Sequence, residues 1–281
     1  LTNILGEALG RRKAEGPLDN LQDFMLDRLD DTLEPLARVL GGRHQWEEMK
    51  ENALLATTGR DGGARLVAAE LKKLAGAAEL EIHFAAHSAG AVFMAPLVKE
   101  IARFAPVRTL TLWAPACTLD LFKQFYLPLL GGADRAIREM ALYTLTDRAE
   151  RDDHCARIYN KSLLYLVSQA FEEEFNVLDP GWPGVPLLGM ERFAADDPDL
   201  RRLLDGKLLQ WVRSPNAESD PRRAAGATSH GGFDDDPATV QGTLVRILGT
   251  KGRAAGVEGL RFARSAASLG DRRRRLNQMR G

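Results

Sequence analysis

The stretch that decides the fold is Glu79-Leu-Glu-Ile-His-Phe-Ala-Ala-His-Ser-Ala-Gly-Ala-Val-Phe-Met-Ala-Pro-Leu-Val98. It opens with a short run rich in β-forming residues, which predicts a buried strand. Ser88 follows among small residues, and the apolar segment after it predicts a helix. Small neighbours suit a serine held at positive φ in a tight turn between strand and helix. The stretch therefore predicts a strand, a sharp turn with a serine at its apex, and a helix.

Strands and helices alternate through the rest of the chain. Further strands are expected at Val107–Ala114, Met140–Thr146 and Lys207–Arg213. The expected helices lie at about Gln45–Ala56, Gly63–Leu74, Leu119–Leu130, Lys161–Glu174, Asp197–Leu204 and Pro237–Leu248. This alternation with short links predicts an α/β fold, a mostly parallel sheet flanked by helices.

Three details of the helices and loops add to this prediction. The helix at Gly63–Leu74 carries its large apolar residues, among them Leu66, Val67 and Leu74, on one face. Asp236 and Pro237 are typical of the N-cap and first position of the last helix. The Pro- and Gly-rich segment Asp179–Gly189 is expected to be a surface excursion or part of a lid.

The chain divides into three segments. Residues 1–59 are expected to be helical, with an apolar repeat from Leu21 to Leu40. Residues 60–249 hold the α/β pattern. Residues 250–281 are basic, because Lys251–Gly281 contains nine Lys or Arg residues and two acidic ones, a charge of +7. We expect a flexible, solubilising tail there rather than a nucleic-acid site.

Composition excludes several classes of protein. The 281 residues carry a formal net charge of −1, so no bulk attraction to nucleic acid or to a membrane surface is expected. No apolar run approaches the roughly 18 residues of a transmembrane helix. Two cysteines are too few for a disulfide framework and fit a reducing compartment, so a cytoplasmic location is expected. The first fourteen residues show no signal-peptide pattern.

The five residues Ala86-His87-Ser88-Ala89-Gly90 form the pattern G-x-S-x-G with alanine in place of the first glycine. On these residues the sequence resembles the α/β-hydrolase family of serine hydrolases, over about residues 60–249. The resemblance implies a nucleophile elbow with Ser88 as the nucleophile, followed along the chain by an acid and then a histidine. A small-residue turn without chemistry would show the same letters.

The resemblance implies that His230 is the base, because it follows the last expected strand in a glycine-bearing loop. The other four histidines fit this position less well. His44 lies too early in the chain and His83 lies inside the expected strand. His87 is adjacent to the serine, and His154 follows Asp147 too closely. Asp147 stands directly after the strand that matches the position of the family's acid. Asp152 and Asp153, in the same loop, are the alternatives.

The backbone amide of Ala89 is implied as one donor of the oxyanion hole. No strand and no second donor motif are recognised before Glu79, so the N-terminal part of a complete hydrolase fold is expected to be missing from this chain, which begins at Leu1. His87 and Gly231 are candidates to line the pocket.

The resemblance implies cleavage of an ester or related acyl bond in a small-molecule substrate. Acyl transfer to an alcohol or amine, and a non-catalytic interaction module, are the alternatives. No cofactor is implied. The run Asp152-Asp153-His154-Cys155 lacks a second group of ligands at metal-site spacing, so no metal is expected. Cys117 lacks an elbow around it. The oligomeric state is left open.

Overall fold

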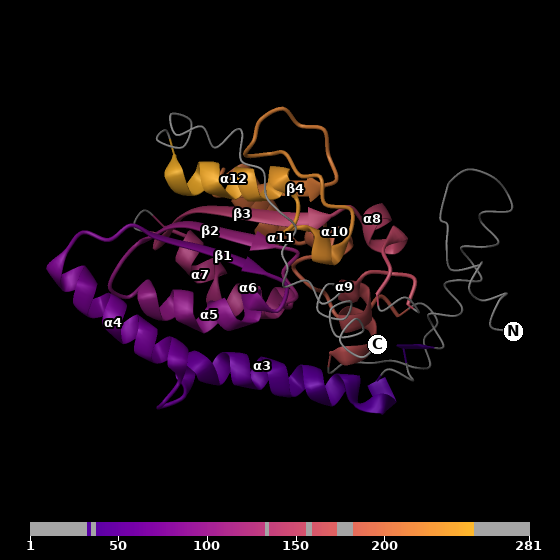
Figure 1. Cartoon of the computed structure of the whole chain (residues 1–281), viewed down its shortest axis with the longest axis horizontal. Coiled ribbons are helices and arrows are strands. Elements are labelled where there is room, and N and C mark those ends of the chain that lie inside the picture. The colour runs from indigo at the N-terminus through magenta and orange to yellow at the C-terminus, as the bar shows by residue number, and fades with distance from the viewer. Residues whose placement is uncertain (1–32, 35–37, 133–134, 156–158, 173–181, 250–281) are drawn as a thin grey trace, which may run out of the picture.

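The computed structural model describes residues 33–34, 38–132, 135–155, 159–172 and 182–249 (Figure 1). The helix expected from the apolar repeat of residues 21–40 falls mainly outside this part, as does the basic tail of residues 250–281. Within it, the chain first makes a π-helical turn, η1 (Arg38–Gly42), in which Gly41 adopts a φ of 95°. Glycine tolerates this conformation because it has no Cβ.

One parallel sheet forms the centre of the fold. Its four strands are β1 (Ile82–His87), β2 (Val107–Trp113), β3 (Ile137–Leu145) and β4 (Leu209–Ser214). They pair in the order β1-β2-β3-β4, and every pair is parallel. The predicted α/β class with a parallel sheet is thus confirmed, and β1 is the strand predicted before Ser88. β1 is an edge strand among the described residues.

Three helices cover one face of the sheet. α5 (Gly90–Ile101) packs on β1 and β2, and α7 (Leu127–Leu130) packs on β3. α6 (Leu119–Phe125) lies between them in sequence, so the single helix expected at Leu119–Leu130 is divided in two at Tyr126, with Pro128 in the first turn of α7. In Figure 1 these three helices lie below the sheet.

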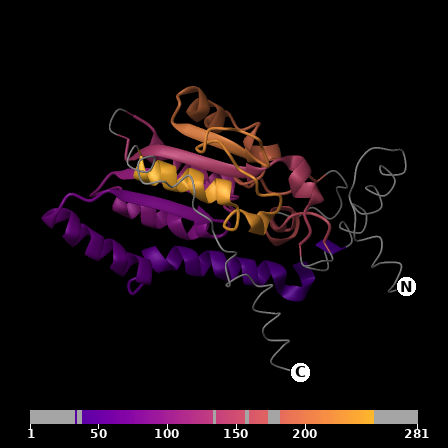
Figure 2. The ribbon, with the colours of Figure 1, turned by 45° about the horizontal axis from the view of Figure 1, so that its top comes forward.

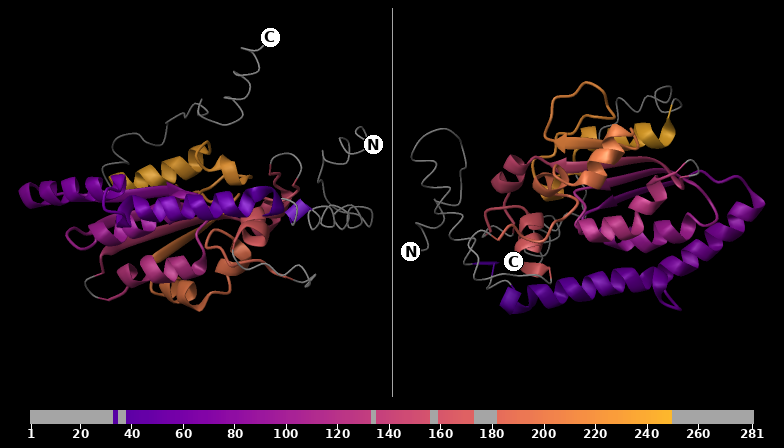
Figure 3. Two further views of the ribbon diagram at one scale, coloured as in Figure 1. Left: turned by 90° about the horizontal axis from the view of Figure 1, so that it is seen from below. Right: turned by 180° about the vertical axis from the view of Figure 1, so that it is seen from behind.

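Two long helices form an outer layer against α5. These are α3 (Arg43–Thr58) and α4 (Gly63–Ala77), and Figure 3 shows them outside the helices that touch the sheet. The buried residues of α4 are Ala64 and Ala68, whereas Leu66 and Val67 are 60% and 54% exposed. The helix is where the sequence predicts it, but most of the predicted apolar face is exposed: of its large side chains, Leu71 is the one that packs partly buried against the core.

The opposite face of the sheet carries α12 (Pro237–Leu248), as Figure 2 shows. Asp236 caps this helix by accepting hydrogen bonds from the amides of Ala238 and Thr239, as predicted. Arg246 of α12 is buried on the sheet, where its guanidinium donates to Glu139 of β3 and Gln210 of β4. These charge-assisted bonds fix α12 on two neighbouring strands.

Short elements fill the connections that follow β3. They are α8 (Asp147–Asp152), α9 (Leu163–Leu166), η2 (Val167–Phe171), α10 (Glu191–Ala194), α11 (Pro198–Asp205) and η3 (His230–Gly232). The segment expected as a surface excursion or lid is buried at its end, because Leu187 and Leu188 are fully covered. The amide of Leu188 donates to the carbonyl of Cys117, which ties this segment to the connection after β2.

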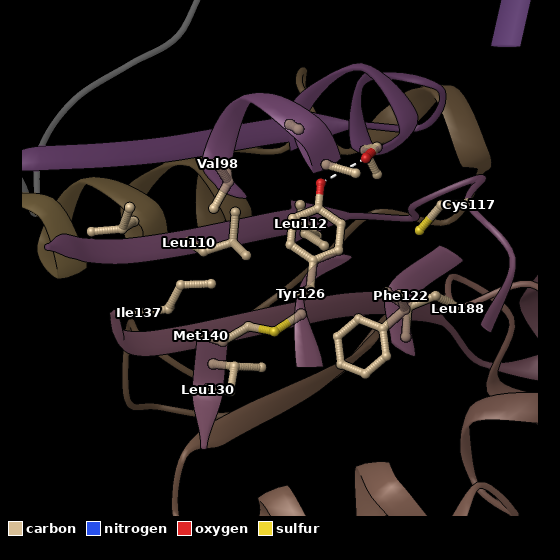
Figure 4. Close-up of a cluster of buried hydrophobic side chains, with 14 of the residues drawn as sticks. Val98, Leu110, Leu112, Cys117, Phe122, Tyr126, Leu130, Ile137, Met140 and Leu188 are labelled. Atoms are coloured by element: carbon tan, nitrogen blue, oxygen red, sulfur yellow. Dashed lines mark hydrogen bonds between the residues drawn. The ribbon is translucent and has the colours of Figure 1, made fainter. Parts of the chain in front are cut away.

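The main core lies between the sheet and the α5–α7 layer (Figure 4). Leu110, Leu112 and Met140 from the strands are fully buried there. Tyr126 lies in the same cluster and donates its hydroxyl to the carbonyl oxygen of Ala91 at 2.6 Å, so its only polar atom is satisfied. This packing fixes α5, and with it the turn that precedes α5.

Replacing a core side chain of the sheet should destabilise the protein strongly. We expect Leu112→Ala to lower the free energy of unfolding by about 2–5 kcal/mol, because it leaves a cavity in a filled core. Leu66→Ala, on the exposed side of α4, is the matched control and should change it by less than about 0.5 kcal/mol. Urea denaturation measures both values, and equal effects would contradict the assigned core.

Candidate active site

The turn at Ser88 joins the end of β1 to the start of α5. Ser88 adopts a φ of 55°, a conformation that costs a non-glycine residue about 1–3 kcal/mol. Three backbone hydrogen bonds hold it there. The Ser88 amide donates to Trp113 O at 3.0 Å, and the Ser88 carbonyl accepts from Ala91 N at 3.1 Å and from Ala116 N at 3.0 Å. The strained backbone is therefore fixed from two sides.

Small residues flank the serine, as the sequence analysis required. A Cβ added at Gly90 would lie 3.5 Å from the Cβ of Ala86, which is ordinary van der Waals contact. Alanine at the position of the pattern's first glycine therefore leaves the approach of strand and helix unobstructed. A larger side chain at either position would meet the other.

His230 reaches Ser88 from the other end of the described chain. It begins η3, in the connection between β4 and α12, and its Nε2 lies 2.8 Å from Ser88 Oγ. The residue is only 6% exposed. Both ends of its backbone are held: its amide donates to Asp153 Oδ2 at 2.7 Å, and its carbonyl lies 2.8 Å from His87 Nε2. Because a carbonyl only accepts, His87 carries its proton on Nε2.

The three acid candidates lie in different places. Asp147 accepts hydrogen bonds from the Tyr165 hydroxyl at 2.6 Å and from Arg151 Nε at 3.0 Å, and within the described residues it makes none to His230. Asp152 is exposed and lies near Arg148. Asp153 reaches His230, through the backbone amide of the histidine. Its other oxygen accepts the amide of His154 at 2.7 Å.

The second ring nitrogen of His230 is the unusual atom of the site. Nδ1 is buried and has no hydrogen-bond partner among the described residues. Burial is the main cause that lowers the pKa of His230 to about 3, and His87 adds to the effect. Burial also lowers the pKa of His87, although the bond to the His230 carbonyl opposes this shift. Both imidazoles are therefore neutral near pH 7, the form that accepts a proton.

One buried carboxyl group close to the site carries no sequence signal. Glu150 in α8 is fully buried and contacts the hydroxyl of Ser162. Burial raises the pKa of Glu150 to about 8, the Ser162 hydroxyl lowers it, and the charges of Asp153 and Asp147 raise it further. In the sequence, Glu150 lies among charged residues such as Arg148 and Arg151, so nothing distinguishes it from a charge on an exposed helix. Only the folded chain reveals its burial.

The remaining predicted residues have simpler positions. Within the described residues the Ala89 amide donates no hydrogen bond, so it is available to an oxyanion. The ring of His87 lies against those of His230 and Phe233, at centroid distances of 5.2 and 6.2 Å. A Cβ added at Gly231 would meet no atom within 4 Å.

The described residues contain no group of three His, Cys, Asp or Glu side chains that could hold a metal ion. Burial raises the pKa of the Cys117 thiol to about 12 and also raises that of Cys155. A thiol with a raised pKa is a poor nucleophile, since the thiolate is the reactive form. None of the described helices is long and apolar enough to cross a membrane.

Comparison with known proteins finds no matching protein-family model, no matching curated protein and no matching solved structure. Any functional conclusion therefore rests on the geometry of this site.

The lowered pKa of His230 predicts that this residue makes the folded chain less stable in acid. Between pH 7.5 and 5.5 the unfolded chain gains a proton on His230 that the folded chain does not accept, so the contribution of His230 to the free energy of unfolding falls by about 1 kcal/mol as the pH falls. The raised pKa of Glu150 acts in the opposite direction in every variant, so the His230 contribution is read from the difference between variants. Urea denaturation at both pH values should show that His230→Asn changes more favourably on acidification than the wild type, by about 1 kcal/mol, whereas the exposed control His154→Asn changes like the wild type. Equal changes in all three proteins would contradict the prediction.

Proposed function

We propose that this chain is a serine hydrolase of α/β-hydrolase-like fold that cleaves an ester or related acyl bond through an acyl-enzyme on Ser88. The observation that carries the proposal is the 2.8 Å contact between Ser88 Oγ and His230 Nε2. The two residues lie 142 positions apart in the sequence, and a serine hydroxyl becomes a nucleophile when a base accepts its proton. The strained φ of Ser88 supports the proposal, because such strain concentrates at functional sites.

In the proposed reaction, Ser88 Oγ forms a bond to the acyl carbon while its proton moves to His230 Nε2. The carbonyl oxygen becomes an oxyanion, which the amide of Ala89 stabilises. The bond to the leaving group then breaks, and His230 returns the proton to the departing oxygen. A water molecule repeats the sequence on the acyl-enzyme, releasing the acid and restoring Ser88. The neutral state of His230 suits this role as base.

We propose Asp153, rather than Asp147, as the acid that orients His230. Asp153 is the candidate whose carboxylate bonds to His230, and Asp147 is engaged with Tyr165 and Arg151. In the substrate complex the Nδ1–H of His230 would donate a hydrogen bond to the Asp153 carboxylate, because catalytic hydrogen bonds often tighten only when substrate is bound. It would then stabilise the imidazolium that forms during the reaction.

A non-catalytic interaction module is the second candidate. Two observations favour it: the unpartnered Nδ1 of His230, and the helical structure of the described residues before β1, which leaves a single oxyanion donor. Losing one oxyanion donor costs about 10²–10³ in rate. An activated serine separates the two candidates, because a module that only binds has no need of one.

A fluorophosphonate probe should label the wild-type protein on Ser88. Ser88→Ala should abolish labelling, and His230→Ala should slow it by about 10³-fold or more, because the hydroxyl then keeps its proton. Ser219→Ala, at an exposed serine, is the control and should be labelled like the wild type. Intact mass spectrometry measures the adduct. An unlabelled wild type that unfolds cooperatively in urea would refute the hydrolase proposal.

The choice of acid gives a separate prediction. Asp153→Asn keeps an oxygen that can accept the amide of His230 but removes the charge, so labelling should slow by about 10²-fold or more while urea stability changes little. The apparent pKa of the base in the pH profile of labelling should also fall, because the carboxylate no longer stabilises the imidazolium. Asp147→Asn should alter neither rate nor profile. The reverse pattern would assign the acid to Asp147.

A further inference from the structure

A cavity of about 620 Å³ lies beside the turn that carries Ser88. Its walls come from α3, from the start of α5 and from the segment after β2 that leads into α6. Glu172 and the segment at Val185 and Pro186 complete it. Cavities of about 300–1,000 Å³ are typical of sites for small organic ligands. This one has no role in the reaction steps derived above.

The cavity shares a wall with the Ser88 turn. Ala116, one of its lining residues, donates its amide to the carbonyl of Ser88 at 3.0 Å. Val92, another lining residue, lies in the first turn of α5 and donates its amide to Ala89 O at 3.0 Å. A molecule bound in the cavity therefore lies next to the residues that hold the serine.

The outer wall of the cavity is fixed by one buried carboxylate. Glu172 is 4% exposed, and its two oxygens accept from Trp46 Nε1 and Lys50 Nζ of α3, each at 2.7 Å. Arg38, just before α3, donates to the backbone carbonyl of Glu172 at 2.7 Å. A buried carboxylate with these partners holds α3 against the end of η2. The position of the α3 wall of the cavity is thus fixed by the hydrogen bonds of Glu172.

The charges in the lining are unbalanced. Among the lining residues that the structure describes, four carboxylates, those of Glu47, Glu51, Asp120 and Glu172, accompany one ammonium group, that of Lys50. Lys50 is paired with Glu172, and Glu47 is paired with Arg43 of the same helix. Glu51 and Asp120 remain, on the α3 and α6 walls respectively, without an ion pair among the described residues. The apolar part of the lining includes Leu54, Val92, Leu121 and Val185.

We propose that this cavity binds the substrate of the hydrolase and that it selects an aliphatic group carrying a positive charge. The inference rests on the proposed function of Ser88. The apolar lining accepts the aliphatic part, and Glu51 and Asp120 attract the cation and repel a carboxylate. The cation can belong to the acyl group or to the alcohol of the ester, since the cavity adjoins the backbone of the Ser88 turn, through Ala116 and Val92, and both parts of the ester approach Ser88.

Two pairs of esters of equal shape test the proposal. The acyl pair is the 4-nitrophenyl esters of 4-(trimethylammonio)butanoate and of its uncharged isostere 5,5-dimethylhexanoate. The alcohol pair is choline butyrate and 3,3-dimethylbutyl butyrate. In at least one pair we expect kcat/KM to favour the cation by about tenfold at low salt, because exposed charges interact over several ångströms. The preference should shrink at 0.5 M NaCl because salt screens such charges.

The double variant Glu51→Gln/Asp120→Asn should reduce this preference to about twofold or less. Glu48→Gln is the matched control, because Glu48 is exposed on the same helix but does not line the cavity, and it should keep the preference. Labelling of Ser88 by a small neutral fluorophosphonate should be equal in all these proteins. An absent preference in both ester pairs, with Ser88 still labelled, would overturn the inference and leave the proposed function standing.

If Ser88 is not labelled, the proposed function fails, and the cavity is tested by binding alone. Calorimetry on Ser88→Ala with 4-(trimethylammonio)butanamide and with 5,5-dimethylhexanamide should then show tighter binding of the cation, lost in the double variant. This result would support the cationic site without the hydrolase. Equal or undetectable binding of the two amides would overturn the inference.

Discussion

Ser88 keeps its positive φ because the backbone around it is bonded to two other parts of the fold. Its amide is held by the last residue of β2, and its carbonyl by α5 and by the segment after β2. These bonds exist only when β1 and β2 are paired in register and α5 lies on the sheet. The buried cluster around Leu112 and Tyr126 supplies that packing. Contacts between segments far apart in the sequence therefore hold Ser88 at its positive φ, and this conformation places its hydroxyl next to His230.

Much of the fold could be read from local patterns. α12 begins at Pro237, as the cap and proline signals predicted, and β2 lies within one residue of its expected bounds. Both signals could be recognised because caps, prolines and β-branched runs act on the backbone locally. The buried face of α4 could not be read in this way. Its leucines and valine suggested one face, whereas the buried residues are Ala64 and Ala68, on a helix that contacts α3 and α5. Which face is buried depends on a partner that periodicity does not identify.

Some residues of the candidate site could likewise be predicted from the sequence, and others could not. Chain order and the small-residue turn were enough to select Ser88 and His230, which the fold brings to 2.8 Å. Order alone favoured Asp147, the first acid after its strand. In the fold, Thr146 caps α8, which begins at Asp147, and the Asp147 carboxylate accepts a hydrogen bond from Tyr165. Asp153, directly after the end of α8, is the residue that accepts a hydrogen bond from His230. Glu150 could not be recognised in the sequence, because its raised pKa comes mainly from burial in the folded chain.

β1 has a strand on one side only within the described part of the chain, and Ala85 in its middle is exposed. Edge strands open more readily than central ones. The serine therefore stands at the end of an edge strand, and fraying of that strand would separate Ser88 from His230 while β2 and β3 remain paired.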